Sequence, residues 1–333
     1  MNSSMWGIDA DVLQRGDFTD GEQEALRRYC DSHLGIVSRL RDLDGGSSRW
    51  GFASAALRCV ANHFDAPHKT TSLDPRVRLA AFFVRAGLGQ PLCNATAVRW
   101  DDPPSAAAPT YLISFNIEGF ILIEDLLKKV CVSAPPPLKQ LIEEVDLASD
   151  NFVALATIFV FLHEMGHVFR GHLEWFPPLG GACDELSERL RDERRVVEMD
   201  ADLFATSSLR VIALGFAESH RRLGSSESDN AWLLGAFLAC FAFFSIVVEE
   251  GFRAGPCYHR PLTRLWAVSQ FMDERVRTMF FGVFAMMPKE VLALLPDQTV
   301  IQPDATDDEL LRLITMPLYM RFMREGRFRG WIV

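Results

Sequence analysis

The pattern of apolar and polar positions changes abruptly in the middle of the chain. The segment 152–162 is a run of uncharged, mostly apolar residues, and it leads directly into His163, Glu164 and His167. An apolar run of this length predicts a buried helix that carries a polar site at one end. Gly171 follows four residues after His167 and is suited to end the helix.

Elsewhere, apolar positions spaced for one helix face predict several more helices. We expect these helices over 20–43, 50–64, 75–87, 118–131, about 184–214, and near 259–273, 288–295 and 307–325. The segment YLISFNI at 111–117 has the composition of a β-strand. The predicted fold is therefore mainly α, of the α+β class, with a small sheet next to the helix that carries the polar site.

A break in this pattern divides the chain. The segment DDPPSAAAP at 101–109 has the prolines and small residues of a loop and is the best internal boundary. We expect a mostly helical N-terminal region of unknown role at 1–105. A second domain at 106–333 carries the polar site.

Composition narrows the function classes. The 333 residues include 49% hydrophobic residues, enough for a sizeable core, and the net charge of -10 argues against a nucleic-acid or anionic-membrane binder. The seven cysteines are scattered without a C-x-x-C pair, and the N-terminus lacks the pattern of a signal peptide. We expect reduced thiols and a cytoplasmic protein; the sequence does not indicate the oligomeric state.

One segment leaves a membrane location open. Residues 231–248 form an uncharged run of eighteen residues, which reaches the length of a transmembrane helix. Acidic residues flank the run on both sides, and no basic cluster marks a cytoplasmic end. We favour a buried core helix over membrane association through this segment.

The polar site has the spacing of a metal centre. His163 and His167 are four residues apart, so on a helix their imidazoles share a face and can hold one metal ion. Glu164 lies beside them, where it can reach a water on the metal. This H-E-x-x-H pattern is the zinc-peptidase signature, with the glutamate as general base.

A catalytic zinc needs a third protein ligand and one position left for water. A histidine six residues after His167 would be one solution, but Leu173 stands there. The segment Glu198-Met199-Asp200-Ala201-Asp202 offers carboxylates four residues apart on one helix face. We assign Glu198 as the third ligand and Asp202 as the acceptor that orients a ligating histidine.

Three residues near the predicted ligands are not assigned as ligands. Asp200 is expected to point away from the metal into solvent. His172 is expected off the ligand face, in a supporting or surface role. The small side chain of Ala201 would let another helix approach closely.

The pair HEMGH and EMDAD resembles gluzincin metallopeptidases, whose second motif is E-x-x-A-D. Two groups are similar: the CAAX prenyl protease and heat-shock membrane protease family, and the phage-exclusion (Lit-type) peptidases. The segment at 257–264, CYHRPLTR, resembles a downstream motif of those enzymes. The resemblance covers about 150–270. It implies that His259 and Arg264 stabilise the reacting centre or support the ligands.

The resemblance implies a zincin-like fold in which a strand upstream of the metal helix lines the cleft. Strand 111–117 could be that strand, pairing with substrate through its edge, or an ordinary internal strand.

These features together indicate a zinc-dependent endopeptidase that cleaves an intracellular protein, with Zn²⁺ as cofactor and a protein or peptide as substrate. The phage-exclusion resemblance implies a narrow target, in defence or stress. The alternatives are a catalytically silent zincin scaffold with a regulatory or binding role, and a membrane-embedded protease of the CAAX type. A structural zinc site is disfavoured, because such sites prefer cysteine ligands.

Overall fold

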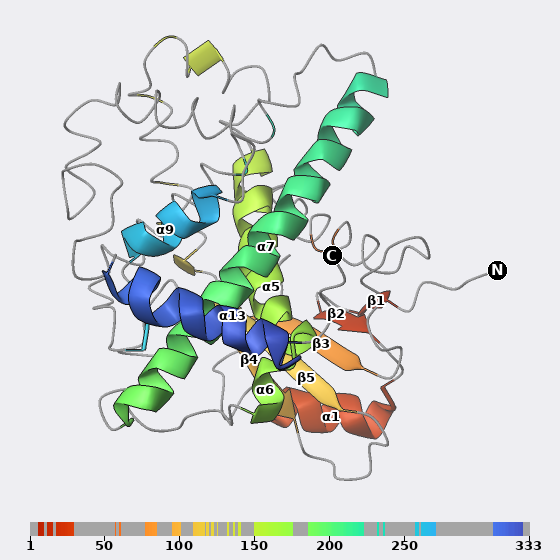
Figure 1. Cartoon of the computed structure of the whole chain (residues 1–333). Helices are drawn as coiled ribbons and strands as arrows, with labels where there is room; N and C mark the ends of the chain where they lie inside the picture. The colour runs from red at the N-terminus through yellow and green to blue at the C-terminus, as the bar shows by residue number, and fades with distance from the viewer. Residues whose placement is uncertain are drawn as a thin grey trace.

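The structure is a computed structural model that describes most of the segments around the predicted site. It describes residues 6–9, 12–15, 18–29, 77–84, 95–100, 109–116, 150–175, 186–222, 257–259, 261–270 and 309–328, with isolated helical positions at 57, 60, 118, 119, 121, 122, 125, 132, 136, 139, 140, 232 and 236. Within these residues the protein is mainly helical with one sheet, as the sequence predicts (Figure 1).

The sheet has five strands in the order β1-β2-β3-β5-β4. The strands are β1 (Trp6–Asp9), β2 (Val12–Arg15), β3 (Arg78–Val84), β4 (Ala95–Trp100) and β5 (Thr110–Asn116). β3 and β5 run parallel, and the other neighbours are antiparallel. The predicted strand at 111–117 is thus confirmed as β5. It lies between two strands, so its edges are not free, and β4 ends the sheet on that side.

Both faces of the sheet are covered by helices. Leu26 of α1 (Asp20–Tyr29) packs with Phe82 and Leu112 on one face. On the other face Phe115 stacks against Phe161 of α5 (Asp150–Phe169), with ring centroids 5.8 Å apart. The helix that carries H-E-x-x-H therefore rests directly on β5 and β4.

The prediction of a helix over 75–87 is wrong, because this segment forms strand β3. Its sequence RLAAFFV is apolar at nearly every position, so it lacks the alternation of a half-exposed strand. A strand that pairs in parallel and is covered on both faces needs apolar residues on both sides. The expectation that the region 1–105 is mostly helical is wrong for its described residues, because they contribute four strands. The division at 105 stays a prediction, and strands from both sides of it pair in one sheet.

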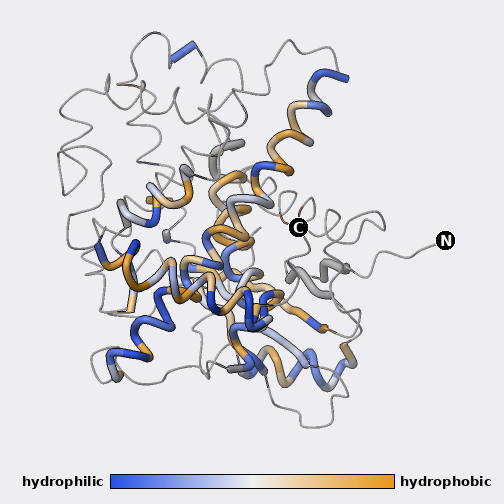
Figure 2. Tube along the Cα trace, in the orientation of Figure 1, coloured by the Kyte–Doolittle hydropathy of each residue, from blue (hydrophilic) through white to orange (hydrophobic). Residues whose placement is uncertain are grey.

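The long helix α7 (Glu188–Arg222) crosses α5 at the level of the polar site (Figure 1). The two helices touch backbone to backbone at Gly166 and Ala201: a Cβ added at Gly166 would lie 3.1 Å from the Ala201 Cα. Both positions carry small residues, as close helix packing requires. Figure 2 shows that α5 is largely hydrophobic, whereas the first turns of α7 are hydrophilic.

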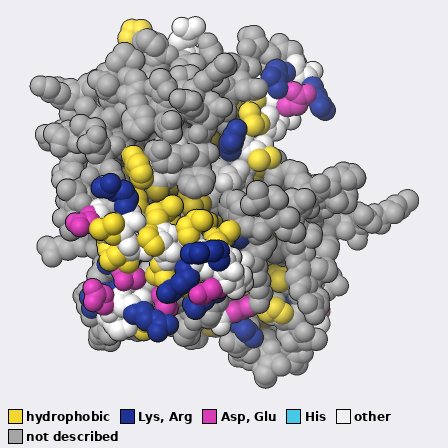
Figure 3. All heavy atoms as spheres, in the orientation of Figure 1, with side chains coloured by type: hydrophobic (Ala, Val, Ile, Leu, Met, Phe, Trp, Pro, Cys, Tyr) yellow, Lys and Arg dark blue, Asp and Glu magenta, His cyan; other side chains and the backbone are white. Residues whose placement is uncertain are grey.

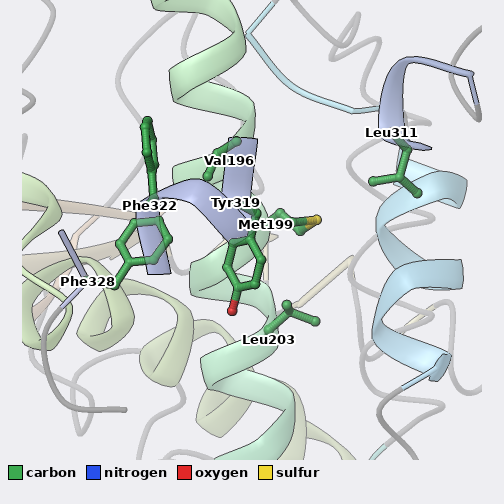
Figure 4. Close-up of a cluster of buried hydrophobic side chains, with 7 residues drawn as sticks. All are labelled: Val196, Met199, Leu203, Leu311, Tyr319, Phe322 and Phe328. Carbon is green, nitrogen blue, oxygen red and sulfur yellow. The ribbon is translucent and has the colours of Figure 1, made fainter. Parts of the chain in front are cut away.

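The C-terminal elements pack across α7. They are α9 (Pro261–Gln270), the π-helical turn η4 (Leu311–Thr315) and α13 (Met316–Arg324). Figure 4 shows the cluster that joins them to α7, formed by Val196, Met199, Leu203, Leu311, Tyr319, Phe322 and Phe328. The outer face of η4 and α13 exposes Leu313, Met316 and Met320, and Figure 3 shows hydrophobic side chains gathered there.

Several predicted elements lie outside the described residues. These are most of 30–43 and 50–64, the segment 288–295, and all of 231–248 except Trp232 and Ala236, which are helical and buried. No helix among the described residues combines the length and the apolar character that crossing a membrane requires.

Because α5 and α7 approach closely at Gly166, the stability of the protein should be sensitive to the size of the side chain at this position. Gly166→Ala should lower the free energy of unfolding, because overpacking against the Ala201 backbone costs about 1–3 kcal/mol. That cost exceeds the gain of at most about 1 kcal/mol from replacing a helical glycine. Gly215 also lies within a helix, but a Cβ added there would meet nothing within 4 Å. Gly215→Ala should therefore raise the free energy of unfolding. Urea unfolding of both variants measures the difference, and equal effects would contradict the close approach.

Candidate metal centre

Three buried side chains converge where α5 crosses α7. The Nε2 atoms of His163 and His167 lie 3.3 Å apart, and Glu198 Oε2 lies 3.4 Å from the first and 3.8 Å from the second. All three residues are buried. They are the one group of metal-ligating side chains found in the part of the chain that the structure describes, and they are the ligands predicted from the sequence.

The spacing of these atoms fits a tetrahedral ion. With metal–ligand bonds of about 2.0–2.1 Å, the edges of a tetrahedron around zinc are about 3.3–3.4 Å. The measured separations of 3.3, 3.4 and 3.8 Å are close to these edges. Two imidazoles and one carboxylate are also a ligand set that catalytic zinc sites use. The residues present therefore fit a zinc ion with one position left open.

Glu198 is held by an arginine from its own helix. Arg194, one turn earlier on α7, forms an ion pair with Glu198, with its Nε 2.9 Å from Oε1. This leaves Oε2 toward the two histidines. Burial alone would raise the pKa of Glu198, but Arg194 and the two histidines hold the pKa well below its ordinary value. Glu198 is therefore an anion that is ready to ligate a cation.

Asp202 lies next to Nδ1 of His163, the ring nitrogen that does not face the other two ligands. This nitrogen lies 2.9 Å from Asp202 Oδ1, at hydrogen-bond distance although the ring N–H is not aligned with the oxygen. Asp202 in turn accepts two hydrogen bonds from Arg264, from Nε at 2.7 Å and from Nη2 at 2.8 Å. The predicted pairing of Asp202 with a ligating histidine is present, and Arg264 fixes that carboxylate.

His167 has a different set of neighbours. Its Nδ1 lies 3.1 Å from Nδ1 of His172, whose Nε2 lies 3.0 Å from Asp200 Oδ2. Arg170 donates to both oxygens of Asp200, at 2.7 and 2.8 Å. The expectation that Asp200 is solvated is wrong, because its side chain is fully buried. The helix α7 is enclosed on this side by α6 (His172–Trp175) and α13, so the polar face it presents here meets protein.

Glu164 lies beside the ligands and contacts the sheet. Its carboxylate accepts a hydrogen bond from the backbone N–H of Ala97 in β4. Burial raises the pKa of Glu164 to about 7, partly offset by the charge of His163. A carboxyl with a pKa near neutrality suits a group that takes up and releases a proton.

The two histidines differ in charge when no cation is bound. Burial alone would lower the pKa of His163, but the neighbouring carboxylates of Asp202 and Glu198 raise it to about 10. The pKa of His167 is well below its ordinary value, first because of burial and also because of the charge on His163. Two imidazolium rings whose Nε2 atoms lie 3.3 Å apart would repel strongly, so only one of the two rings, that of His163, carries a positive charge.

The downstream segment is tied to neighbouring elements by hydrogen bonds. Arg264 uses its guanidinium on Asp202, and His259 Nε2 lies 2.9 Å from Thr315 Oγ1 in the buried η4 turn. Tyr258 lies nearer the ligands: its hydroxyl is hydrogen-bonded to Arg194, and the charge of Glu198 raises its pKa. The catalytic assignments of His259 and Arg264 stay predictions.

Sequence reasoning missed Arg170, Arg194 and Tyr258, and it wrongly placed Asp200 in solvent. Arg194 could have been found, because it precedes Glu198 by four residues on the same helix face. Arg170 could not, because its pairing with Asp200 depends on how two distant helices cross. His172 reaches His167 because Gly171 adopts a left-handed backbone (φ 77°) that turns the chain back after α5.

Zinc binding should strengthen as the pH rises. At neutral pH the free protein carries a proton on His163, whose pKa is about 10, and a metal ligand must be neutral. Each bound zinc therefore displaces that proton, and the apparent affinity should rise about tenfold per pH unit below this pKa. Isothermal titration calorimetry in buffers of different ionisation enthalpy counts the protons released.

The matched control is His163→Ala, which lacks both the ligand and the proton. It should show neither stoichiometric zinc binding nor proton release. Wild-type zinc affinity that stays constant between pH 6 and 9 would contradict the protonation state assigned to His163.

Comparison with known proteins returns no relative. No family model, no curated protein and no solved structure matches this chain. The metal centre therefore stands on the positions of its own side chains, and the likeness to gluzincin peptidases stands on the two motifs.

Proposed function

We propose that the protein is a zinc-dependent endopeptidase that hydrolyses a protein substrate inside the cell, with Glu164 as general base. The supporting observation is the buried His163, His167 and Glu198 group, whose ligand atoms are spaced for one zinc ion. A structural zinc site would have no use for a further acidic group beside its ligands, yet Glu164 lies next to them with a raised pKa. Zinc in such a site activates a water molecule and polarises a carbonyl oxygen.

The protein's own residues have separable roles in this reaction. His163, His167 and Glu198 would hold the ion, and Glu164 would take a proton from the attacking water and pass it to the leaving amine. Tyr258 and Arg194 lie beside Glu198 and are hydrogen-bond donors. In this proposal they would donate to the oxygen on which negative charge develops.

The edge of the sheet offers a way to hold the substrate. Residues of an antiparallel strand direct their N–H and C=O groups alternately toward the partner strand and away from it. Because the N–H of Ala97 donates to Glu164, this residue faces away from β5, as do Ala95 and Arg99. Among the described strands, none pairs with this edge of β4. An extended peptide that paired there would lie alongside Glu164.

The deciding experiment compares the wild type with Glu164→Gln. Glutamine keeps the shape of the side chain but cannot take up a proton, so zinc content should stay at one ion per chain. Proteolysis should fall by about 10²–10⁴-fold. New N-termini in a digested cell lysate, identified by mass spectrometry, measure the activity, and atomic emission measures the zinc.

Glu193→Gln is the matched control. Glu193 is also a buried glutamate, but it pairs with Arg189 and is not among the ligands. This variant should cleave like the wild type. Zinc-loaded wild type that generates no N-termini beyond those of Glu164→Gln would refute the peptidase and leave a catalytically silent zinc-binding scaffold.

A further inference from the structure

The side of His167 that faces away from the other ligands leads into a chain of buried polar groups. The chain runs from His167 Nδ1 to His172 Nδ1 (3.1 Å), and from His172 Nε2 to Asp200 Oδ2 (3.0 Å). It ends on Arg170, which donates two hydrogen bonds to Asp200. His172, Asp200 and Arg170 are each at most 1% exposed. We call these three residues the His172 arm.

When both imidazoles are neutral, the order of donors and acceptors along this arm has one consistent solution. Asp200 only accepts, because both of its oxygens take hydrogen bonds from the Arg170 guanidinium, as an ionised carboxylate does. His172 must therefore donate from Nε2, which leaves a lone pair on its Nδ1. That lone pair accepts from His167, whose proton then resides on Nδ1. His167 is left with a lone pair on Nε2, the atom that faces His163 and Glu198.

The opposite arrangement creates two conflicts. If His167 carried its proton on Nε2, an N–H would point into the ligand group and no lone pair would be available there. His172 would then donate from Nδ1 and turn the lone pair of Nε2 toward Asp200, placing two acceptors 3.0 Å apart.

We infer that His172 is a positioning residue for the metal centre: with Asp200 and Arg170 it fixes the tautomer and the orientation of the ligand His167. This inference rests on the proposed zinc centre and adds to it. His163 is oriented directly by an aspartate–arginine pair, whereas His167 reaches its own pair only through an inserted histidine. Groups that orient a ligating imidazole in this way commonly contribute 10–100-fold to metal affinity.

Neighbouring aromatic side chains enclose the His172 arm. The ring of Phe328 packs edge-on against His172, with centroids 5.2 Å apart, and lies 5.2 Å from the Arg170 guanidinium carbon. Phe328 belongs to the cluster that fixes α13 on α7 (Figure 4). Tyr319 of α13 is hydrogen-bonded to Asp200. A polar chain enclosed in this way has few alternative partners.

Two substitutions at His172 separate orientation from packing. His172→Phe keeps an aromatic ring against Phe328 but removes the acceptor, and should raise the zinc dissociation constant roughly 10–100-fold. His172→Asn places an amide oxygen near the position of Nδ1, and should recover most of the affinity. Competition with a chromophoric chelator measures zinc binding, and circular dichroism establishes that each variant is folded.

Three results would overturn the inference. Folded His172→Phe that binds zinc as tightly as the wild type would show that the acceptor has no effect. Equal weakening in His172→Phe and His172→Asn would show that the ring acts by packing. The third result comes from ¹⁵N NMR of the ring nitrogens in zinc-loaded wild type, which needs no variant: a proton on Nδ1 of His172 would contradict the assigned tautomers.

These outcomes are distinguishable from failure of the proposed function. Wild type that takes up no zinc would remove the metal centre and the arm together. Wild type that binds zinc but cleaves nothing would remove only the peptidase, and the two His172 variants would still report on the arm.

Discussion

The metal centre depends on how closely two helices approach each other. α5 supplies two imidazoles and α7 one carboxylate, and these side chains are short, so their atoms meet only if the backbones nearly touch. Gly166 and Ala201 provide that contact, with the Ala201 Cα 3.1 Å from where a glycine Cβ would be. Each small residue lies inside a ligand motif, one between the positions of Glu164 and His167 and the other between Asp200 and Asp202. The motifs therefore encode the packing of the helices as well as the chemistry.

Burying this much charge requires strict local pairing. Three carboxylates on α7 are buried within two turns, and each has its own arginine: Glu198 with Arg194, Asp200 with Arg170, and Asp202 with Arg264. An unpaired buried charge costs several kcal/mol, so loss of any one arginine would leave an expensive anion. The three arginines come from three different elements: α7 itself, the turn after α5, and α9. The centre thus couples the packing of these elements to the electrostatics of the ligands.

The sequence predicted the parts of this centre that are local. The spacings within α5 and within α7 place His163, His167, Glu198 and Asp202 on faces that the structure brings together. The predictions that are wrong concern what packs against a helix or strand. The apolar pattern of 75–87 predicts a helix, because a strand covered on both faces lacks the alternation that would identify it. The sequence of α7 predicts a solvated Asp200, because one helix does not show what packs against its far side.

The protein covers the centre more completely on the His167 side than on the Glu198 side. On the His167 side, His172, Asp200 and Arg170 are sealed beneath Phe328 and α13. On the side of Glu198, the side chain of Arg194 retains 25% of its exposure, and most of β4 is only half-buried. The His172 arm lies on the closed side, whereas Glu164, the general base of the proposed reaction, contacts β4. In the proposed peptidase, a substrate would therefore reach the ligands from the β4 side, where the described residues bring the backbone groups of β4 and Glu164 next to each other.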